Sequence, residues 1–429
     1  MRLLYPSQTA LVLGGGGAKG AYEIGAIAAL YDLGIRPASV YGTSIGAVNA
    51  AMYAQGDMSQ AEELWDRLQI EDLLTPESLH LADDAEALFD HPEKLLEFIT
   101  RNAQRKGINI APLQKLLGAY VNEERIRQSG VRFGLVATKF PSMAMVQKRL
   151  EDMEPGTLMR WLMASCACFP VFPMARIGEE RYIDGGFCDN VPVDMAIESG
   201  AQHIIAIDIG RNLSHAQYRL RPNVTYIRAS HPLGGLLTFD PAASQRNKTL
   251  GYNDTLRAFG RLRGTDYSFD AHDARLLHNR ACRFLAELTQ LESRLQREHA
   301  LTRKDEAPLF AQLEAHIRPG ADAVDYFLRA CELCAEIARL DPARVYTLES
   351  FTAALRTALP FDKAETMLSS LLGGRIGVLF APPQPDKRLI IACLYHLLQR
   401  ETVFSPLALR TLCAFPKEML CALTLKEIL

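Results

Sequence analysis

The sequence lacks an apolar run of the roughly 20 residues that a membrane span requires; its longest, around residues 389–398, has the length of a core helix. It also lacks an excess of charge, because 47 basic residues stand against 50 acidic ones and the formal net charge is -3. Nucleic acid is therefore not an expected partner, and any membrane attraction would be apolar.

Since Arg2 leads directly into an apolar strand without a cleavage site, we expect no secretory signal. The predicted location is cytoplasmic, with peripheral membrane contact left open.

The cysteines lack the pattern of a disulfide framework or of a zinc site. Nine is an odd number, and most of them lie in apolar segments, which indicates free buried thiols in a reducing compartment. Cys331 and Cys334 have the spacing of half a metal site, but they lie within the helical pattern 326–337 and no second ligand pair follows. We predict no metal and no cofactor.

The chain length of 429 residues allows two or three domains. Strands alternate with helices from residue 10 to about 263, which favours an α/β fold with a mostly parallel central sheet flanked by helices. Amphipathic helices over about 57–130 read as an insertion covering one side of this sheet. After about residue 270 no convincing strand remains. The predicted domains are an α/β domain at 1–265 and an all-helical domain of unknown role at 270–429.

Ser44 lies in the pattern Gly42-x-Ser44-x-Gly46, between an apolar run at 39–41 and an alanine-rich run at 47–54. This pattern is typical of a sharp strand-to-helix turn that holds a serine strained and exposed, with the positive end of the helix directed at its hydroxyl. Small residues two before and two after the serine let the backbone cross itself. Because the motif also occurs by chance, its neighbours decide its meaning.

Four consecutive glycines, Gly14–Gly17, follow the first predicted strand and precede Lys19 and Gly20. Such a loop exposes several backbone amides toward one point. A phosphate-binding Walker loop does not fit, because Lys19 follows an alanine and precedes a glycine. A dinucleotide fingerprint lacks the acidic residue that it needs at the end of the second strand. An oxyanion hole and a purely structural tight turn remain as interpretations.

A carboxylate, Asp184, follows the short predicted strand 181–183 and precedes Gly185 and Gly186. In a parallel sheet the glycine loop, Ser44 and Asp184 would all lie at the carboxyl ends of strands, where such folds place their sites. The sequence therefore predicts that these three features converge.

Together these motifs resemble the patatin-like phospholipase family, as a bacterial-type patatin domain with an additional helical C-terminal region. The resemblance covers about residues 11–262 and rests on several motifs in the family's order, which are more specific jointly than singly. They are Gly15-Gly16-Gly17-Ala18-Lys19-Gly20, Gly42-Thr43-Ser44-Ile45-Gly46, the segment from Ala164-Ser165 to Pro170, Asp184-Gly185-Gly186 with Asn190-x-Pro192, and Gly251-Tyr252.

The resemblance implies a three-layer hydrolase fold and a serine acyl-ester hydrolase acting on lipids, of the phospholipase A or lysophospholipase type. It implies a dyad in which Ser44 attacks the ester, Asp184 accepts the proton, and water then hydrolyses the acyl-enzyme. It also implies that amides of the glycine loop stabilise the oxyanion. The implied oxyanion residues are Gly15, Gly16 and Gly17, and the supporting motif residues are Lys19, Gly20, Gly42, Gly46, Gly185 and Gly186. Lys19 either steadies the loop, neutralises a lipid headgroup, or is an exposed structural lysine.

Several alternatives stay open. His203 or His231 near strand ends could complete a triad, whereas Asp208 reads more simply as a cap on its own loop. The apolar loop 231–239 either contacts a lipid interface or packs under the C-terminal helical region. The same acyl-enzyme would serve an acyltransferase, and a scaffold protein could retain the fold while its helical region mediates protein contacts. Nothing in the sequence predicts an oligomeric state.

Overall fold

The computed structural model describes residues 8–73, 110–169, 171–210, 216–270, 272–297, 309–314, 317, 320–372, 386–399 and 415–429. The chain divides into two compact units, residues 1–259 and 260–429. Each unit has its own architecture and hydrophobic core, so each is described separately.

The first unit is built on a mixed, mostly parallel sheet in the order β5-β6-β3-β2-β1-β7-β8, with β4 paired to β3 off this path. Strands β3, β2, β1, β7 and β8 run parallel to one another, whereas β4 and β6 run antiparallel to β3. The strand bounds are β1 Thr9–Leu13, β2 Ser39–Thr43, β3 Arg132–Phe140, β4 Ala144–Arg149, β5 Ala175–Ile177, β6 Glu180–Asp184, β7 His203–Asp208 and β8 Val224–Arg228. The pairing of the two runs predicted at 131–138 and 144–150 is confirmed.

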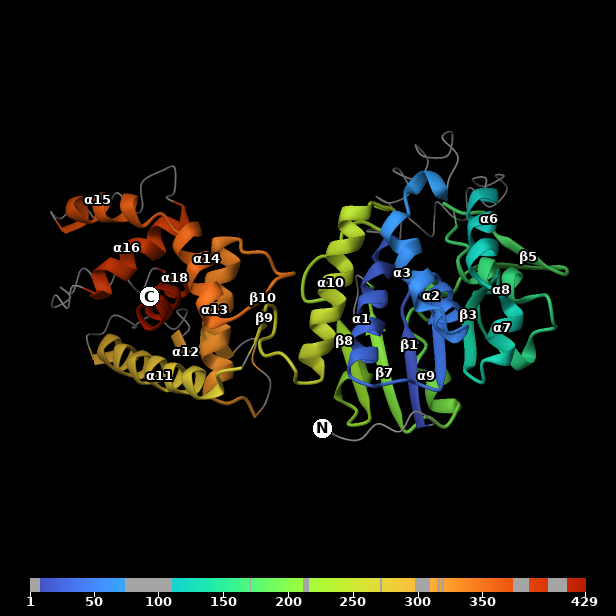
Figure 1. Cartoon of the computed structure of the whole chain (residues 1–429), viewed down its shortest axis with the longest axis horizontal. Coiled ribbons are helices and arrows are strands. Elements are labelled where there is room, and N and C mark those ends of the chain that lie inside the picture. The colour runs from blue at the N-terminus through green and yellow to red at the C-terminus, as the bar shows by residue number, and fades with distance from the viewer. Residues whose placement is uncertain are drawn as a thin grey trace. The chain divides into compact units, whose positions relative to one another are not determined.

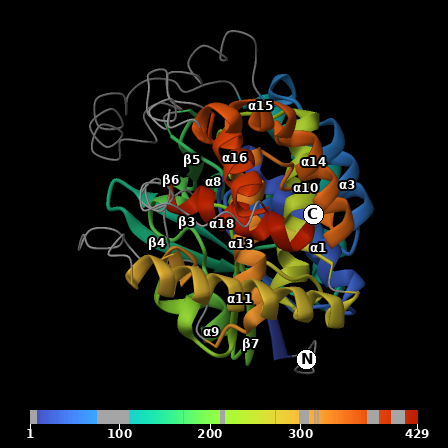
Figure 2. The ribbon, with the colours of Figure 1, turned by 90° about the vertical axis from the view of Figure 1, so that its left-hand side faces the viewer.

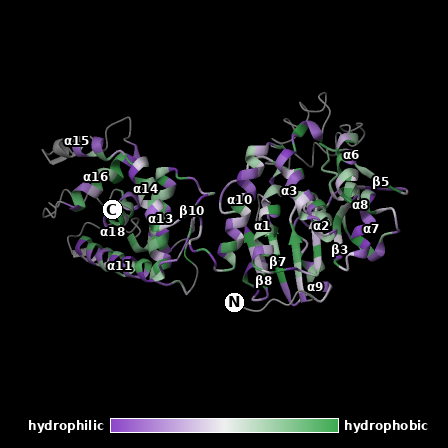
Figure 3. Ribbon diagram, in the orientation of Figure 1, coloured by the Kyte–Doolittle hydropathy of each residue, from purple (hydrophilic) through white to green (hydrophobic). Residues whose placement is uncertain are grey.

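Helices cover both faces of this sheet, which gives the predicted three layers (Figure 1). Helices α2 and α8 pack on one face, where α1 lies along α10, and α9 packs on the other against Val12 and Tyr41. Figure 3 shows mainly hydrophobic residues in the central strands, as expected for parallel strands buried on both faces. The helix bounds are α1 Ala21–Asp32, α2 Ile45–Ala54, α8 Leu158–Ser165, α9 Val193–Glu198 and α10 Pro241–Ala258, with short 3₁₀ turns η2 Gly17–Gly20, η4 Leu150–Asp152, η5 Gly185–Phe187 and η6 Ala216–Leu220.

The register of β3 brings the ends of two other strands together. Ala137 pairs with Val146 of β4 and with Asp184 of β6, so β4 and β6 lie on opposite edges of β3. The preceding residue, Val136, pairs with β4 as well, and on its other edge with Thr43 of β2. Strands β2 and β6 therefore lie end to end along one edge of β3, and they meet between Thr43 and Asp184.

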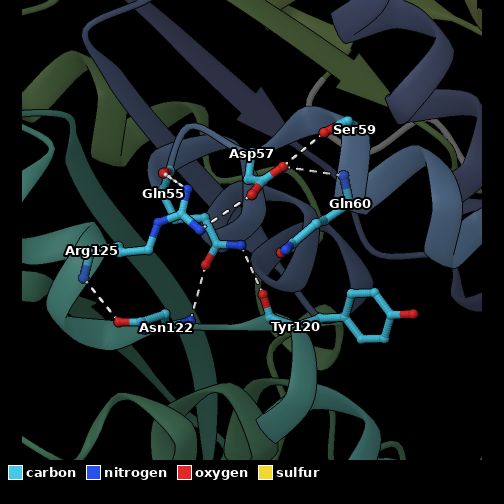
Figure 4. A network of polar contacts seen from close by, with 7 residues as sticks. All are labelled: Gln55, Asp57, Ser59, Gln60, Tyr120, Asn122 and Arg125. Atoms are coloured by element: carbon cyan, nitrogen blue, oxygen red, sulfur yellow. Dashed lines mark hydrogen bonds and ion pairs between the residues drawn. The ribbon is translucent and has the colours of Figure 1, made fainter.

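Polar contacts tie together the two ends of the predicted helical insertion (Figure 4). Gln55, just after α2, donates to the Tyr120 carbonyl at 2.8 Å and accepts from the Asn122 amide at 3.0 Å. Arg125 pairs with Asp57 at 3.2 Å. The chain therefore leaves the sheet layer and returns to it at one place. The described elements are α3 Met58–Arg67, η3 Ile70–Asp72, α6 Ala111–Tyr120 and α7 Glu123–Gln128; the apolar run predicted at 95–99 lies outside the described residues.

The second unit is helical and packs around α18, which is buried along most of its length and contacts α11, α12, α13 and α16 (Figure 2). The described helices are α11 Ala274–Arg297, α12 Leu309–Glu314, α13 Ala323–Ala338, α14 Leu348–Ala358, α15 Phe361–Leu372, α16 Lys387–Gln399 and α18 Pro416–Ile428. The prediction of no strand after about residue 270 is wrong in one detail, because β10 (Val345–Tyr346) forms a two-residue parallel ladder with β9 (Ser268–Phe269), which lies just before that region. A run of two residues is too short for the alternating pattern by which strands are predicted.

Cys331 and Cys334 of α13 are buried in the core of the second unit, where the Cys334 thiol donates to the Cys421 carbonyl. Across the described ranges, no helix combines the length and the hydropathy that crossing a membrane would take.

Candidate active site

Ser44 lies at a strained turn between β2 and α2. Its φ of 54° and ψ of -127° fall outside the regions that L-residues normally occupy. The flanking glycines are required by close backbone contacts. A Cβ on Gly42 would lie 2.3 Å from the Gly46 carbonyl oxygen, and one on Gly46 would lie 2.5 Å from the Leu13 carbonyl oxygen. The backbone crossing predicted from the glycine spacing is therefore present, and α2 begins directly behind the hydroxyl.

The Ser44 hydroxyl donates to Oδ2 of Asp184 at 2.5 Å. The other carboxylate oxygen, Oδ1, accepts the amide of Gly186 at 2.7 Å. Convergence of the serine and the aspartate was predicted. The expectation that both follow parallel strands was wrong for Asp184. Strand β6 runs antiparallel to its neighbour, and Asp184 reaches the carboxyl edge of the parallel strands because β6 ends where β2 ends.

The residue Asp184 is buried, with 5% of its surface exposed. Burial raises its pKa to about 6, although the hydrogen bonds from Ser44 and Gly186 act in the opposite direction. A carboxylate with this pKa is a better proton acceptor than a free aspartate, whose pKa is about 3.9. The site thus provides a hydroxyl in contact with a base that is ionised at neutral pH.

The glycine loop lies beside Ser44, but its three predicted oxyanion donors are not equivalent. The Gly15 amide donates to the Asn190 carbonyl at 3.1 Å, and the Asn190 side chain returns a hydrogen bond to the Gly15 carbonyl at 3.1 Å. The two hydrogen bonds join Gly15 to Asn190, so the Gly15 amide is occupied. This contradicts its assignment as an oxyanion donor in this conformation. The amides of Gly16 and Gly17 have no acceptor within the part of the chain that the structure describes.

Close contacts of three glycines show how tightly the loop and the turn after Asp184 are packed. Gly17 has a φ of 57°, and a Cβ there would lie 2.1 Å from the Leu236 carbonyl oxygen, so a side chain would be strained. A Cβ on Gly185 would lie 2.3 Å from the Val136 carbonyl oxygen. Gly20 packs against the indole of Trp65, and a Cβ on Gly20 would lie 2.7 Å from the nearest indole carbon. Lys19 is 6% exposed, so its interpretation as an exposed lysine is wrong.

An apolar cavity of about 730 Å³, its open mouth included, adjoins Ser44. The walls come from α2, α3, α6, the segment after α8 and the loop before α10, and they include Trp65, Leu117, Phe172, Leu236 and Phe239. The Trp65 and Phe239 rings stack with centroids 6.3 Å apart. The loop 231–239 therefore contributes to the cavity wall, which neither of its two interpretations predicted.

Two thiols, Cys166 and Cys168, also line this cavity. Burial raises the pKa of both, and the nearby charge of Asp184 raises it further. Both thiols therefore stay protonated at neutral pH and are poor nucleophiles compared with thiolates. The reactive candidate in this cavity is Ser44.

The cavity lining in the described part of the chain includes neither histidine alternative. His203 begins β7 and pairs with Thr9 at the start of β1, so it lies at the amino edge of the parallel strands, opposite to Ser44. His231 lies in the loop that follows β8. Asp208 accepts the Gly210 amide at 2.8 Å, which confirms its predicted role as a cap.

Sequence reasoning missed two residues that hold the site together. Asn190 clips the glycine loop, and the Ser165 hydroxyl accepts the amide of Ser44 at 2.9 Å. Both residues lie in motifs that were noted without a role. Their partners are more than 100 positions away along the chain, so no local pattern identifies the contacts.

The first unit is thus a three-layer α/β protein with a serine on a strained turn, a buried aspartate in contact with it, and an apolar cavity beside both. Residues 11–197 match the model of the patatin-like phospholipase family, which confirms over this range the resemblance seen in the sequence motifs.

Curated relatives match about half of the chain at low identity. Patatin-like phospholipase domain-containing protein 7 of Rattus norvegicus is 28% identical over 211 residues, which are 49% of this chain and 14% of that protein. Lysophospholipase NTE1 of Scheffersomyces stipitis is 27% identical over 209 residues, again 49% of this chain and 12% of its own length. This chain therefore matches only a small part of each relative. Among solved structures, VipD from Legionella pneumophila aligns over 97% of this chain and 92% of its own, with 14% identity and a TM-score of 0.38.

Proposed function

We propose that this protein is a serine acyl-ester hydrolase that acts on lipids, of the phospholipase A or lysophospholipase type. The observation that carries the proposal is the 2.5 Å contact between the Ser44 hydroxyl and the buried Asp184 carboxylate beside an apolar cavity. The family of the domain supports the same chemistry, and one relative is named a lysophospholipase.

In the proposed reaction, the acyl chain of the substrate occupies the apolar cavity and its ester carbonyl lies against Ser44. Asp184 accepts the hydroxyl proton as Ser44 Oγ attacks the carbonyl carbon, which gives a tetrahedral intermediate with a negatively charged oxygen. The amides of Gly16 and Gly17 are the proposed donors to this oxygen, and one such donor typically supplies about 2.7 to 4 kcal/mol of transition-state stabilisation.

Collapse of the intermediate releases the alcohol, which takes the proton from Asp184, and leaves the acyl group on Ser44. A water molecule then attacks the acyl-enzyme while Asp184 accepts its proton. The fatty acid leaves, and the proton returns to the Ser44 oxygen. Asp184 serves as base and acid in both halves, so no histidine is needed.

Labelling with a fluorophosphonate probe tests this proposal, because the probe reacts with activated serines. We expect the wild-type protein to be labelled and Ser44→Ala to be unlabelled and inactive on lysophospholipids. Ser39→Ala is the matched control, since it removes a buried serine hydroxyl from the same strand at its opposite end. Absence of labelling that depends on Ser44 would contradict the enzyme proposal and favour the scaffold alternative.

The acyltransferase alternative differs only in what attacks the acyl-enzyme. Product analysis with and without an added acceptor alcohol separates the two. Free fatty acid as the main product in both reactions is expected for a hydrolase, whereas a dominant transfer product would identify a transferase.

A further inference from the structure

Ser165, the last residue of α8, connects the nucleophile turn to the neighbouring strand. Its side chain is fully buried. The Ser44 amide donates to the Ser165 hydroxyl oxygen at 2.9 Å, and that hydroxyl donates to the carbonyl of Val136 on β3 at 2.7 Å. One hydroxyl thus links the amide of the proposed nucleophile to the sheet.

The position of this link explains why a side chain is needed. Strands β2 and β3 pair in parallel up to Thr43 and Val136, after which Ser44 leaves the extended conformation with a φ of 54°. The Ser44 amide therefore cannot continue the hydrogen bonding between β2 and β3, and a buried amide without an acceptor destabilises the fold. The Ser165 hydroxyl stands between this amide and the carbonyl of β3, and so stabilises the strained conformation.

The same segment also fixes the partner of Ser44. The Asp184 amide donates to the Ala167 carbonyl at 2.8 Å, only two residues beyond Ser165. The end of α8 therefore holds both residues of the proposed dyad through separate hydrogen bonds. The distance between the Ser44 hydroxyl and the Asp184 carboxylate depends on this one short segment.

We infer that Ser165 is a positioning residue, whose hydroxyl holds Ser44 in the strained conformation from which its Oγ reaches Asp184. The inference rests on the proposed function, because it assigns Ser165 a role in that reaction. Ser165 acts through the Ser44 backbone, so its loss changes the rate of acylation and leaves the cavity for the acyl chain in place.

The test compares Ser165→Ala with wild type and with Ser39→Ala. Ser39 is a suitable control because it is also a fully buried serine, and its hydroxyl has no hydrogen-bond partner in the part of the chain that the structure describes. For Ser165→Ala we expect kcat and the rate of fluorophosphonate labelling to fall roughly 10- to 100-fold, with KM little changed. We expect Ser39→Ala to keep both rates within about twofold, because it breaks no hydrogen bond.

The pH profile adds a readout that a purely structural role would not change. The hydrogen bond from Ser44 lowers the pKa of Asp184, so weakening it moves the acidic limb of the Ser165→Ala profile to higher pH. Should Ser165→Ala fail to fold, Ser165→Cys decides, because it keeps a similar side chain but only a weak hydrogen-bonding group. We expect this variant to be labelled at least about tenfold more slowly than wild type.

A folded Ser165→Ala or Ser165→Cys variant that is labelled at the wild-type rate would overturn the inference. Wild-type protein without Ser44-dependent labelling would instead contradict the proposed function, so the two failures are distinguishable.

Discussion

The Asp184 carboxyl is buried, yet each of its oxygens accepts one hydrogen bond, from Ser44 and from Gly186. Burial disfavours the charged form, and the two donors only partly offset this effect. The result is a carboxyl that is mostly ionised at neutral pH but close enough to neutrality to accept a proton during a reaction. Burial thus brings the pKa of an aspartate close to that of the histidine that acts as the base in a triad.

We predict that kcat/KM rises with pH through a midpoint near 6, because the proposed base is active only when the carboxyl is ionised. A pH–rate profile from about pH 4 to 9 measures this midpoint. Asp184→Asn should lower kcat/KM by at least about 100-fold, since it removes the base.

A histidine would titrate in nearly the same range, so variants must separate the two assignments. His203→Ala and His231→Ala should keep both the activity and the midpoint, because His203 lies at the opposite edge of the sheet and His231 is not part of the described cavity lining. A folded histidine variant that loses activity or its acidic limb would contradict the dyad.

At the residue scale, local sequence was informative where a single turn decides the geometry. The strained turn at Ser44 follows from two glycines within two residues, and the structure contains the predicted backbone crossing. The engagement of Gly15 could not be predicted, because its amide is occupied by Asn190, which is remote in sequence. An oxyanion donor needs an amide that is free, and sequence alone does not reveal which amides are already bonded.

At the scale of elements, strand β6 shows a second limit of prediction from sequence, which concerns strand direction. A strand-helix alternation predicts parallel strands, but the direction of a short strand depends on its pairing partner. β6 occupies the part of the β3 edge that β2 leaves free. The location of Asp184 was predicted correctly even though the direction of its strand was not.

Helices α1 and α10 cross with almost no space between their backbones. A Cβ on Gly25 would lie 1.8 Å from the Lys248 carbonyl oxygen, and one on Gly251 would lie 1.9 Å from the Tyr22 carbonyl oxygen. The Tyr22 hydroxyl also donates to Asp254 of α10 at 2.8 Å. The Gly251-Tyr252 motif noted in the sequence is therefore part of a close helix crossing.

We predict that Gly25→Ala and Gly251→Ala each lower the free energy of unfolding by about 1 to 3 kcal/mol, because the added methyl groups force these helices apart. Gly118→Ala is the matched control in helix α6, where an added Cβ has no neighbour within 4 Å. It should be neutral or stabilise by up to about 1 kcal/mol, since alanine favours helices over glycine. Urea unfolding of the three variants measures these differences. Equal stability of all three would show that the α1–α10 crossing adapts to a methyl group.

At the scale of the whole molecule, the family match and the proposed chemistry concern only the first unit. The family model ends at residue 197, whereas residues 260–429 form a second compact unit with a core of their own. A buried carboxylate anchors the beginning of this unit to α13. Glu332, 1% exposed, accepts the amides of Thr265, Asp266 and Tyr267 and pairs with Arg329 at 3.0 Å.

We predict that Glu332→Gln lowers the free energy of unfolding of the second unit by about 1 to 3 kcal/mol, because it weakens the hydrogen bonds from several buried amides and removes one of the two ion pairs of Arg329, which keeps Asp266. Glu336→Gln is the matched control, since this glutamate lies on the same helix and is exposed. Hydrogen exchange read peptide by peptide should show faster exchange across 260–429 in Glu332→Gln only. Fluorophosphonate labelling of Ser44 should be unchanged in both variants, because Ser44 belongs to the other unit. If peptides of both units exchange faster together, the two units unfold as one cooperative block, and the second unit supports the fold of the first.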